Sequence, residues 1–249
     1  MGRRSVGPLG GGERPGKPGR GRSALPSPVP PSFVPYQPET VAPDEALQRV
    51  RALREELEGR RTVRMFDPDR PVAREVIEEV LLAAGTAPSG AHKQPWTFVA
   101  VCDADLKRRI REATEEQERR FYEEVAPDEW LRDLEPLGTD FHKAHLTDAP
   151  WLLVVFAQDH ALRPDGSKAK HYYVSESVGI ACGFLLAAVR RAGLVALTHT
   201  PSPMGYLRDL LGRPANERTY LVVPVGYPAP DCAVPDLRRK GLDEFVVWR

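Results

Sequence analysis

The sequence predicts an α+β fold in which a small mixed sheet is sandwiched between helices. Short apolar runs of strand length alternate irregularly with longer amphipathic segments, without the regular βαβ order of a parallel sheet. Apolar residues make up 41% of the chain and charged residues 28%, as in a globular protein with a sizeable core. At 249 residues the chain can form one large domain or two small ones.

The first 43 residues differ in composition from the rest. They contain ten of the 25 prolines and eight of the 20 glycines. Such a segment buries too little apolar surface to offset its ordering entropy, so we expect a disordered tail over 1–43 and a folded domain over 44–249. The tail is basic, which leaves a plain linker and a docking arm both open. The net charge of zero provides no overall field for nucleic acid.

Two amphipathic helices are expected at the start of the folded part. The first begins at Asp44, a capping residue, and presents Leu47, Val50 and Leu53 at helical spacing before Gly59 ends it. A second helix is expected over 73–84, with a glycine as its stop.

The remaining elements follow from the same patterns. Asp103 precedes a long charged segment and is expected to cap its helix. Strands are expected at 97–102, 151–157, 194–197 and 220–226, helices at 104–124, 170–192 and 204–211, and short helices and loops at 125–147. The last apolar residues, 245–248, are expected to add a strand to a neighbouring subunit's sheet.

Cysteine usage and hydropathy indicate a soluble, cytoplasmic protein without a membrane span. Cys102, Cys182 and Cys232 are odd in number and lack metal-type spacing, so we expect free thiols in a reducing compartment. The longest apolar run, 178–189, is too short to cross a bilayer, and the N-terminus lacks the apolar core of a secretory signal. No metal site is expected, and no glycine-rich nucleotide fingerprint indicates a dedicated NAD(P) domain.

Three segments carry features that suggest ligand binding. Ser89, Gly90 and Ala91 form a small-residue turn that lets backbone N–H groups approach a flat or anionic ligand. Arg60-Arg61-Thr62-Val63-Arg64 places three guanidiniums within five residues, which suits phosphate binding, although a solvated basic patch gives the same pattern. Thr198-His199-Thr200 puts two hydroxyls at a strand end, which is also an ordinary strand-to-turn signal.

Together these segments resemble the iodotyrosine deiodinase branch of the nitroreductase flavoprotein superfamily. The resemblance runs from about Leu53 to Val247 and includes the segment 234–240 near the C-terminus. It implies an FMN cofactor, with Arg239 on its phosphate. The cofactor-binding residues it implies are Arg60, Arg61, Thr62, Val63, Arg64, Ser89, Gly90, Thr198, His199, Thr200 and Arg239.

The resemblance also implies a substrate lid at about 115–147. Glu118 and Tyr122 are four residues apart, so they project from one helix face, and Lys143 follows 21 residues later. In the family pattern the carboxylate meets the ammonium of a halotyrosine, while the lysine and the phenol meet its carboxylate. Each of these residues alone would be read as part of a solvated charged surface.

The implied reaction is the reductive dehalogenation of halotyrosine, which releases halide and tyrosine. In it the Thr200 hydroxyl bonds the flavin N5, and the Ala91 N–H contacts substrate and stabilises its phenolate. The electrons come from NAD(P)H directly or through a separate reductase. A broad nitroaromatic or quinone reductase and a flavin-binding protein without turnover are the alternatives.

The resemblance implies an intertwined homodimer with two FMN sites, in which Ser89, Gly90 and Ala91 come from the opposite subunit. Two features depart from the family pattern. His199 stands where a threonine is expected, which adds a titratable group there. Pro127 and Pro136 interrupt the lid and can change how it orders on substrate.

Overall fold

The computed structural model describes residues 30–249. Of the tail predicted over 1–43, residues 1–29 lie outside the described part, and residues 30–42 form neither helix nor strand. The folded part begins with α1 (Pro43–Glu58), so Asp44 lies in its first turn rather than at its cap, which corrects that prediction. None of the residues of α1 is buried.

A four-stranded sheet lies at the centre of the fold, in the order β1-β2-β6-β5. The strands are β1 (Trp96–Val101), β2 (Trp151–Gln158), β6 (Glu217–Gly226) and β5 (Val195–Ala196). All neighbouring strands pair antiparallel, and the parallel component is a single bridge between Thr62 and Ala196. This bridge joins the arginine-rich segment to the sheet.

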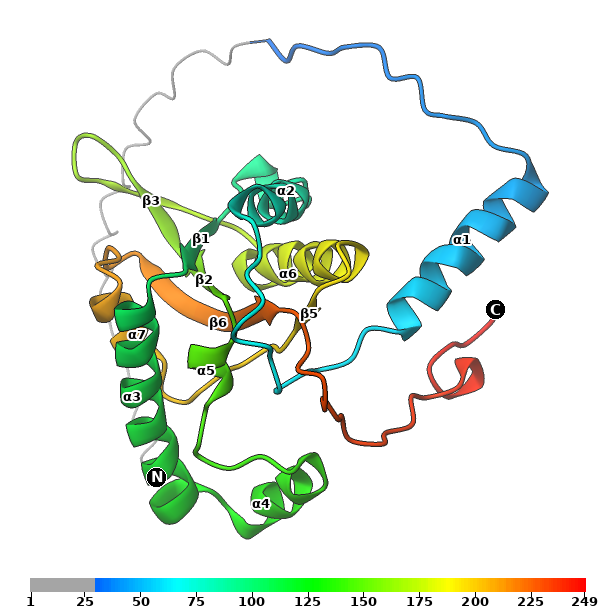
Figure 1. Ribbon diagram of the computed structural model, residues 1–249. Coiled ribbons are helices and arrows are strands. Elements are labelled where there is room, and N and C mark those ends of the chain that lie inside the picture. The colour runs from blue at the N-terminus through cyan, green and yellow to red at the C-terminus, as the bar shows by residue number, and fades with distance from the viewer. Residues whose placement is uncertain (1–29) are drawn as a thin grey trace, which may run out of the picture. The chain divides into compact units, whose positions relative to one another are not determined.

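Helices cover both faces of the sheet. On one face lie α2 (Arg74–Gly85) and α6 (Val174–Arg191), and on the other lie α3 (Ala104–Arg120), α5 (His145–Asp148) and α7 (Gly205–Leu210) (Figure 1). Successive side chains of a strand point to opposite faces, so β2 serves both cores. Leu153 and Val155 pack toward α2 and α6, whereas Leu152 and Val154 pack toward α3, α5 and α7.

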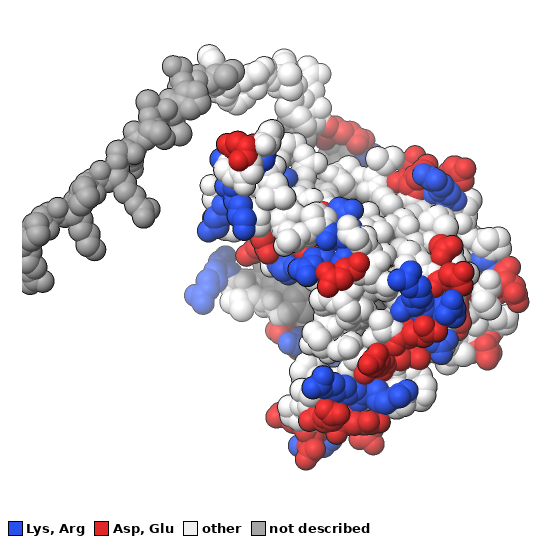
Figure 2. Space-filling view, turned by 90° about the vertical axis from the view of Figure 1, so that its left-hand side faces the viewer, with Lys and Arg blue, Asp and Glu red and all other residues white. Residues whose placement is uncertain are grey.

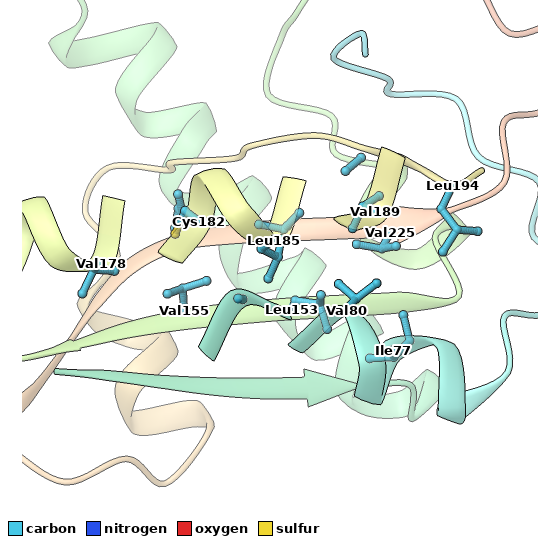
Figure 3. Packing of buried hydrophobic residues seen from close by; sticks show 14 of the residues in the cluster. Ile77, Val80, Leu153, Val155, Val178, Cys182, Leu185, Val189, Leu194 and Val225 are labelled. Carbon is cyan, nitrogen blue, oxygen red and sulfur yellow. The ribbon is translucent and has the colours of Figure 1, made fainter. Parts of the chain in front are cut away.

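The core beneath α6 is built from aliphatic side chains. Figure 3 shows Val178, Leu185 and Val189 of α6 meeting Leu153 and Val155 of β2. Burying a side chain of this size contributes about 1.5–3 kcal/mol. The expected helix at 170–192 therefore exists, but it begins only at Val174.

The late start of α6 has a backbone cause. Tyr173 has a φ of +50°, in the left-handed region where a helix cannot continue. The preceding residues form a hairpin that the sequence patterns did not predict, made of β3 (His160–Leu162) and β4 (Lys168–Lys170).

The charged helix expected over 104–124 is also divided. Asp103 caps it as predicted, with its side chain accepting a hydrogen bond from the Leu106 N–H at 2.7 Å. The α-helix ends at Arg120 and continues as a π-helical turn, Phe121–Val125. Pro127 then prevents continuation, because the residue before a proline is pushed to extended geometry. A short helix, α4 (Asp128–Leu134), and a 3₁₀ turn, Glu135–Leu137, complete this segment.

The surface is charged in both signs. Figure 2 shows acidic and basic side chains interspersed over one face of the molecule. On α3 these groups form pairs one helical turn apart, such as Arg108 with Glu112 and Arg111 with Glu115. Within residues 30–249, no helix is long and apolar enough to cross a bilayer.

Candidate functional site

Two cavities, each about 300 Å³ in volume, lie on either side of Arg64. The first is lined by Arg60, Arg61, Thr62, Arg64, Leu137, Val234, Pro235, Leu237, Arg238 and Arg239. Among these residues five are arginines and none is acidic. Such a concentration of guanidiniums favours an anionic ligand.

Backbone carbonyls fix the guanidiniums of this first cavity. Arg239 donates to the Glu58 carbonyl at 3.1 Å and to the Arg60 carbonyl at 2.7 Å. Arg61 donates to the carbonyl of Pro235. The segment behind them is tied to the sheet, because the N–H of buried Val63 donates to the Ala196 carbonyl at 3.1 Å. Arg61 and Arg239 are therefore held without a counter-ion, whereas Arg238 pairs with Glu244 outside the cavity lining.

The guanidiniums of the first cavity repel one another, and the pKa of Arg60 reflects this repulsion. Burial lowers the pKa of Arg60, and the neighbouring charges of Arg239 and Arg61 lower the pKa further. An anion bound among them would relieve this repulsion. Phosphate is an anion that arginine binds well through paired hydrogen bonds.

The second cavity brings together the residues of the predicted lid and those that follow β5. It is lined by Arg64, Glu118, Phe121, Tyr122, Trp130, Leu134, Thr139, Lys143, His145, Leu197, Thr198, His199, Thr200 and Ser202. Aromatic, cationic and hydroxyl groups thus surround one space, as a binding site for a polar aromatic molecule requires.

The extended segment after β5 alternates in burial. Thr198 and Thr200 are exposed, whereas His199 between them is buried. The N–H of His199 donates to the Val222 carbonyl and its carbonyl accepts from the Val222 N–H, each at 2.8 Å. These two backbone hydrogen bonds to β6 fix the segment so that the side chains of both threonines lie on its exposed side.

Glu118, Tyr122 and Lys143 meet in this cavity, although the chain separates the first and last by 25 positions. The Glu118 carboxylate lies 3.2 Å from the Lys143 ammonium, and their side chains are only 11% and 4% exposed. The ammonium lies 5.5 Å from the centre of the Tyr122 ring, and the Tyr122 hydroxyl donates to the Thr139 carbonyl at 3.4 Å. We call these three residues the clamp.

Sequence reasoning missed the residues that support the clamp. Glu115 accepts a 2.7 Å hydrogen bond from the Lys143 N–H and another from Arg111 at 2.7 Å. Phe121 packs edge-on against Trp130, with 5.1 Å between ring centres. Glu115 stands in a run of charged residues, so only its spacing of three from Glu118 could have indicated that its side chain is partly buried.

The loop of Ser89, Gly90 and Ala91 lines neither of these two cavities. The Gly90 N–H lies 3.4 Å from the Ser177 hydroxyl of α6, and a Cβ at this position would come within 2.7 Å of the Tyr172 carbonyl. Ala91 has a φ of +51°, and His92 and Gln94, which follow it closely, share this left-handed geometry. Strained backbone of this kind concentrates at functional sites.

Two histidines lie against each other at the wall of the second cavity. His145 and His199 have ring centres 5.2 Å apart and are 5% and 8% exposed. Burial lowers the pKa of each to about 3; His145 is affected further by His199, Lys143, Arg64 and Arg111, and His199 by Lys143 and Arg64. Both rings are therefore neutral at pH 7.

Residues 57–227 match the family model described as the nitroreductase family. Among curated proteins, the iodotyrosine deiodinase of Haliscomenobacter hydrossis is 54% identical over 84% of this chain and 94% of its own. Iodotyrosine deiodinase 1 of Homo sapiens is 46% identical over 86% of this chain and 74% of its own.

Solved structures agree with these matches. A crystal structure of oxidized iodotyrosine deiodinase bound to FMN and 3-iodo-L-tyrosine aligns with a TM-score of 0.66 and 32% identity, covering 79% of this chain and 100% of that one. A BluB-like flavoprotein from Clostridium difficile aligns with a TM-score of 0.61 at 20% identity, over 79% of this chain and 98% of that one, which shows likeness of fold alone.

Proposed function

The chain belongs to the nitroreductase family, and from this premise we propose that it is an FMN-dependent enzyme that removes halide from halotyrosine. The observation that carries the proposal is the buried Glu118–Lys143 pair at the wall of the cavity that Thr198 and Thr200 also line. A reductase for uncharged nitroaromatics or quinones has no use for two opposite charges placed to bind an amino-acid zwitterion.

The residues of the first cavity fit the phosphate of FMN. Arg60, Arg61 and Arg239 supply guanidiniums that have no acidic partner in the cavity lining, and those of Arg61 and Arg239 are already held by backbone carbonyls. Thr62, Val63 and Arg64 continue from there toward the second cavity, where they would follow the edge of the flavin. Thr198, His199 and Thr200 would flank its ring, with the hydroxyl of Thr200 donating to N5. Once bound and reduced, FMN would supply the two electrons of the reaction.

The clamp would open to receive the substrate. Without substrate, Glu118 and Lys143 neutralise each other, so neither charge is buried alone. A zwitterion would insert between them, with its ammonium on Glu118 and its carboxylate on Lys143 and the Tyr122 hydroxyl. One ion pair is thereby exchanged for two, and closure of the segment at about 115–147 would exclude water from the ring.

The chemistry that this arrangement supports is a two-electron reduction. The carbon–halogen bond breaks, halide leaves with its electron pair, and the ring carbon takes up a proton to give tyrosine. The protein orients the ring and excludes water, and the backbone N–H of Ala91 would hold the phenolate oxygen.

The complete site would need two subunits. Ser89, Gly90 and Ala91 lie away from both cavities, so we propose that they serve the site of a partner in a homodimer. Exposed apolar residues support such a contact, among them Leu53 of α1 and Phe245 and Trp248 near the C-terminus. Sedimentation of the FMN-bound protein tests this, and a monomer would refute it.

Electrons would reach the flavin from NAD(P)H directly or from a separate reductase. Anaerobic mixing with NADPH separates the two routes, because only direct transfer bleaches the flavin without a second protein. The three free cysteines support a reducing, cytoplasmic compartment.

The activity can be tested with the purified yellow protein. It is incubated anaerobically with dithionite and 3-iodotyrosine, and tyrosine and iodide are measured. We expect at least one tyrosine and one iodide per flavin. If the flavin is bound and reduced but no iodide appears, the protein is not a dehalogenase, and turnover of a nitroaromatic would then identify the broad reductase.

A further inference from the structure

The buried contact between His145 and His199 connects the two groups of residues that line the second cavity: those of the predicted lid and those that follow β5. His145 begins α5, two residues after the clamp lysine. His199 lies between the two threonines and is fixed to β6 by its backbone. Any interaction between the two rings therefore links the base of the clamp to the segment that would flank the flavin.

One nitrogen of each ring has no partner in the described part of the surrounding protein. The Nε2 atoms of both histidines are buried and lack a hydrogen-bond partner within the described residues. A buried polar atom left unpaired costs about 1–3 kcal/mol. Two such atoms on rings that contact each other indicate that each is the natural partner of the other.

The spacing of the rings fits a direct bond between them. A hydrogen bond between nitrogens spans about 2.9–3.0 Å, and each imidazole adds about 1 Å from its centre to its edge. These lengths together come close to the observed 5.2 Å between ring centres. In the structure of residues 30–249 neither Nε2 atom has a partner, so the bond requires a change in the side-chain torsion angles of at least one ring.

Burial and, after it, the surrounding charges lower the pKa of both rings and keep them neutral, which is the state that such a bond needs. A neutral imidazole carries one donor and one acceptor, whereas a protonated one carries two donors. The charged groups that act on the rings are Lys143 before α5, Arg64 after α1 and Arg111 on α3. All three are cations that disfavour a further positive charge, so one ring can donate and the other accept.

We propose that His145 and His199 share one ring-to-ring hydrogen bond and act as a positioning pair that sets the clamp against the flavin-flanking segment. This role rests on the proposed function, because it concerns how halotyrosine is held. The pair does not touch the reacting atoms. It fixes the distance between Lys143, which would hold the substrate's carboxylate, and Thr200, which would lie beside the flavin. The amino-acid group and the ring of the substrate can then be bound at the same time.

The bond itself can be observed without any activity measurement. Nitrogen-15 NMR of the FMN-bound protein at pH 7 should show two neutral imidazoles with different nitrogen shifts at Nε2, and one ring N–H proton protected from exchange. His199→Val should abolish this protected proton. Two rings that exchange freely with solvent would overturn the proposal.

The positioning role is tested by a double-mutant cycle on the dissociation constant of 3-iodotyrosine. His145→Phe and His199→Val should each weaken binding about fivefold, the effect of one hydrogen bond, and the double variant should weaken it no further. Binding of FMN should be unchanged in His145→Phe, because His145 lies on the clamp side of the cavity and the phosphate site lies beyond Arg64. Independent losses that multiply in the double variant would mean two packing defects and no shared bond.

A conservative variant separates polarity from packing and covers a failure to fold. Gln carries its amide nitrogen near the position of Nε2, so His199→Gln should restore most of the affinity lost in His199→Val. If His199→Gln binds as weakly as His199→Val, the proposal fails. If wild type binds no halotyrosine while the NMR shows the bond, the proposed function fails instead.

Discussion

The two cavities on either side of Arg64 hold their charges in opposite ways. In the first, the guanidiniums of Arg61 and Arg239 are fixed by the backbone carbonyls of Pro235, Glu58 and Arg60. In the second, Glu118 and Lys143 neutralise each other on a helix end and a loop. Under the proposed function, the first site is formed before FMN arrives, whereas the second must break its internal ion pair to bind the substrate.

This difference predicts different consequences for mutation. Removing one charge from a self-neutralised pair leaves a buried charge alone, which is strongly destabilising. Removing one of several exposed or half-exposed guanidiniums weakens ligand binding but leaves the protein stable.

Breaking the clamp pair should cost the most. Lys143→Met leaves the Glu118 carboxylate buried without a partner, and we expect a loss of about 3–5 kcal/mol in unfolding free energy, measured by urea denaturation. The double variant Glu118→Gln/Lys143→Met should recover much of this loss. If the single and double variants have equal unfolding free energies, the two charges do not stabilise each other in the folded protein.

Acid should destabilise the second cavity through its histidines. Their pKa is lowered to about 3 in the folded protein, so below pH 6.5 the unfolded chain binds protons that the folded chain does not. Stability therefore falls as the pH falls, by roughly 2 kcal/mol for each histidine between pH 7 and pH 5. His145→Phe/His199→Val should flatten this dependence, measured by urea unfolding at both pH values. A matched control, His160→Gln in the β3–β4 hairpin, should keep the full slope.

A substitution in the first cavity should change ligand binding and leave stability nearly unchanged. Arg239→Gln should weaken FMN binding by about 1.5–3 kcal/mol, the effect of losing charge-assisted hydrogen bonds, with little change in stability. The control is Arg74→Gln, an exposed arginine on α2 that pairs with Glu78. Flavin fluorescence titration measures both, and an unchanged FMN affinity in Arg239→Gln would contradict the phosphate assignment.

Removing one clamp charge should also weaken substrate binding while FMN stays bound. Glu118→Gln is expected to weaken halotyrosine binding by about 1.5–3 kcal/mol, because the substrate ammonium loses a charged partner. Quenching of flavin fluorescence by 3-iodotyrosine measures this change. A dissociation constant equal to that of wild type would refute the clamp.

The smallest effect is expected at the aromatic contact within the lid. Trp130→Ala removes the edge-on contact with Phe121, which is worth about 0.5–1.5 kcal/mol. Because Trp130 is half-exposed, this change should lower halotyrosine affinity more than stability. Comparing its urea midpoint and its 3-iodotyrosine dissociation constant with those of wild type separates the two effects.

The features that could be predicted from the sequence are those that depend on local pattern. The helix at Arg74–Gly85, the strand at Trp151–Gln158 and the cap at Asp103 follow from periodicity and from one capping residue. The meeting of Glu118, Tyr122 and Lys143 was expected from their spacing together with a family resemblance, since each alone would be read as a solvated residue.

Other features depend on tertiary contacts that no local pattern encodes. The start of α6 is set by the left-handed Tyr173, a residue type that gives no such signal in sequence. The partial burial of Glu115 and the ring contact between His145 and His199 require segments far apart in the chain to meet. The sequence indicated that His199 is unusual, but its partner could only be found in the structure.

The most direct test of this account compares single turnovers of wild type and Glu118→Gln/Lys143→Met, each loaded with FMN and reduced anaerobically. We predict equal flavin content in both, tyrosine and iodide in a one-to-one ratio from wild type with 3-iodotyrosine, and little or no release from the double variant at the same substrate concentration. Equal release from both proteins, or none from fully reduced wild type, would contradict the assignment of the second cavity as a halotyrosine site.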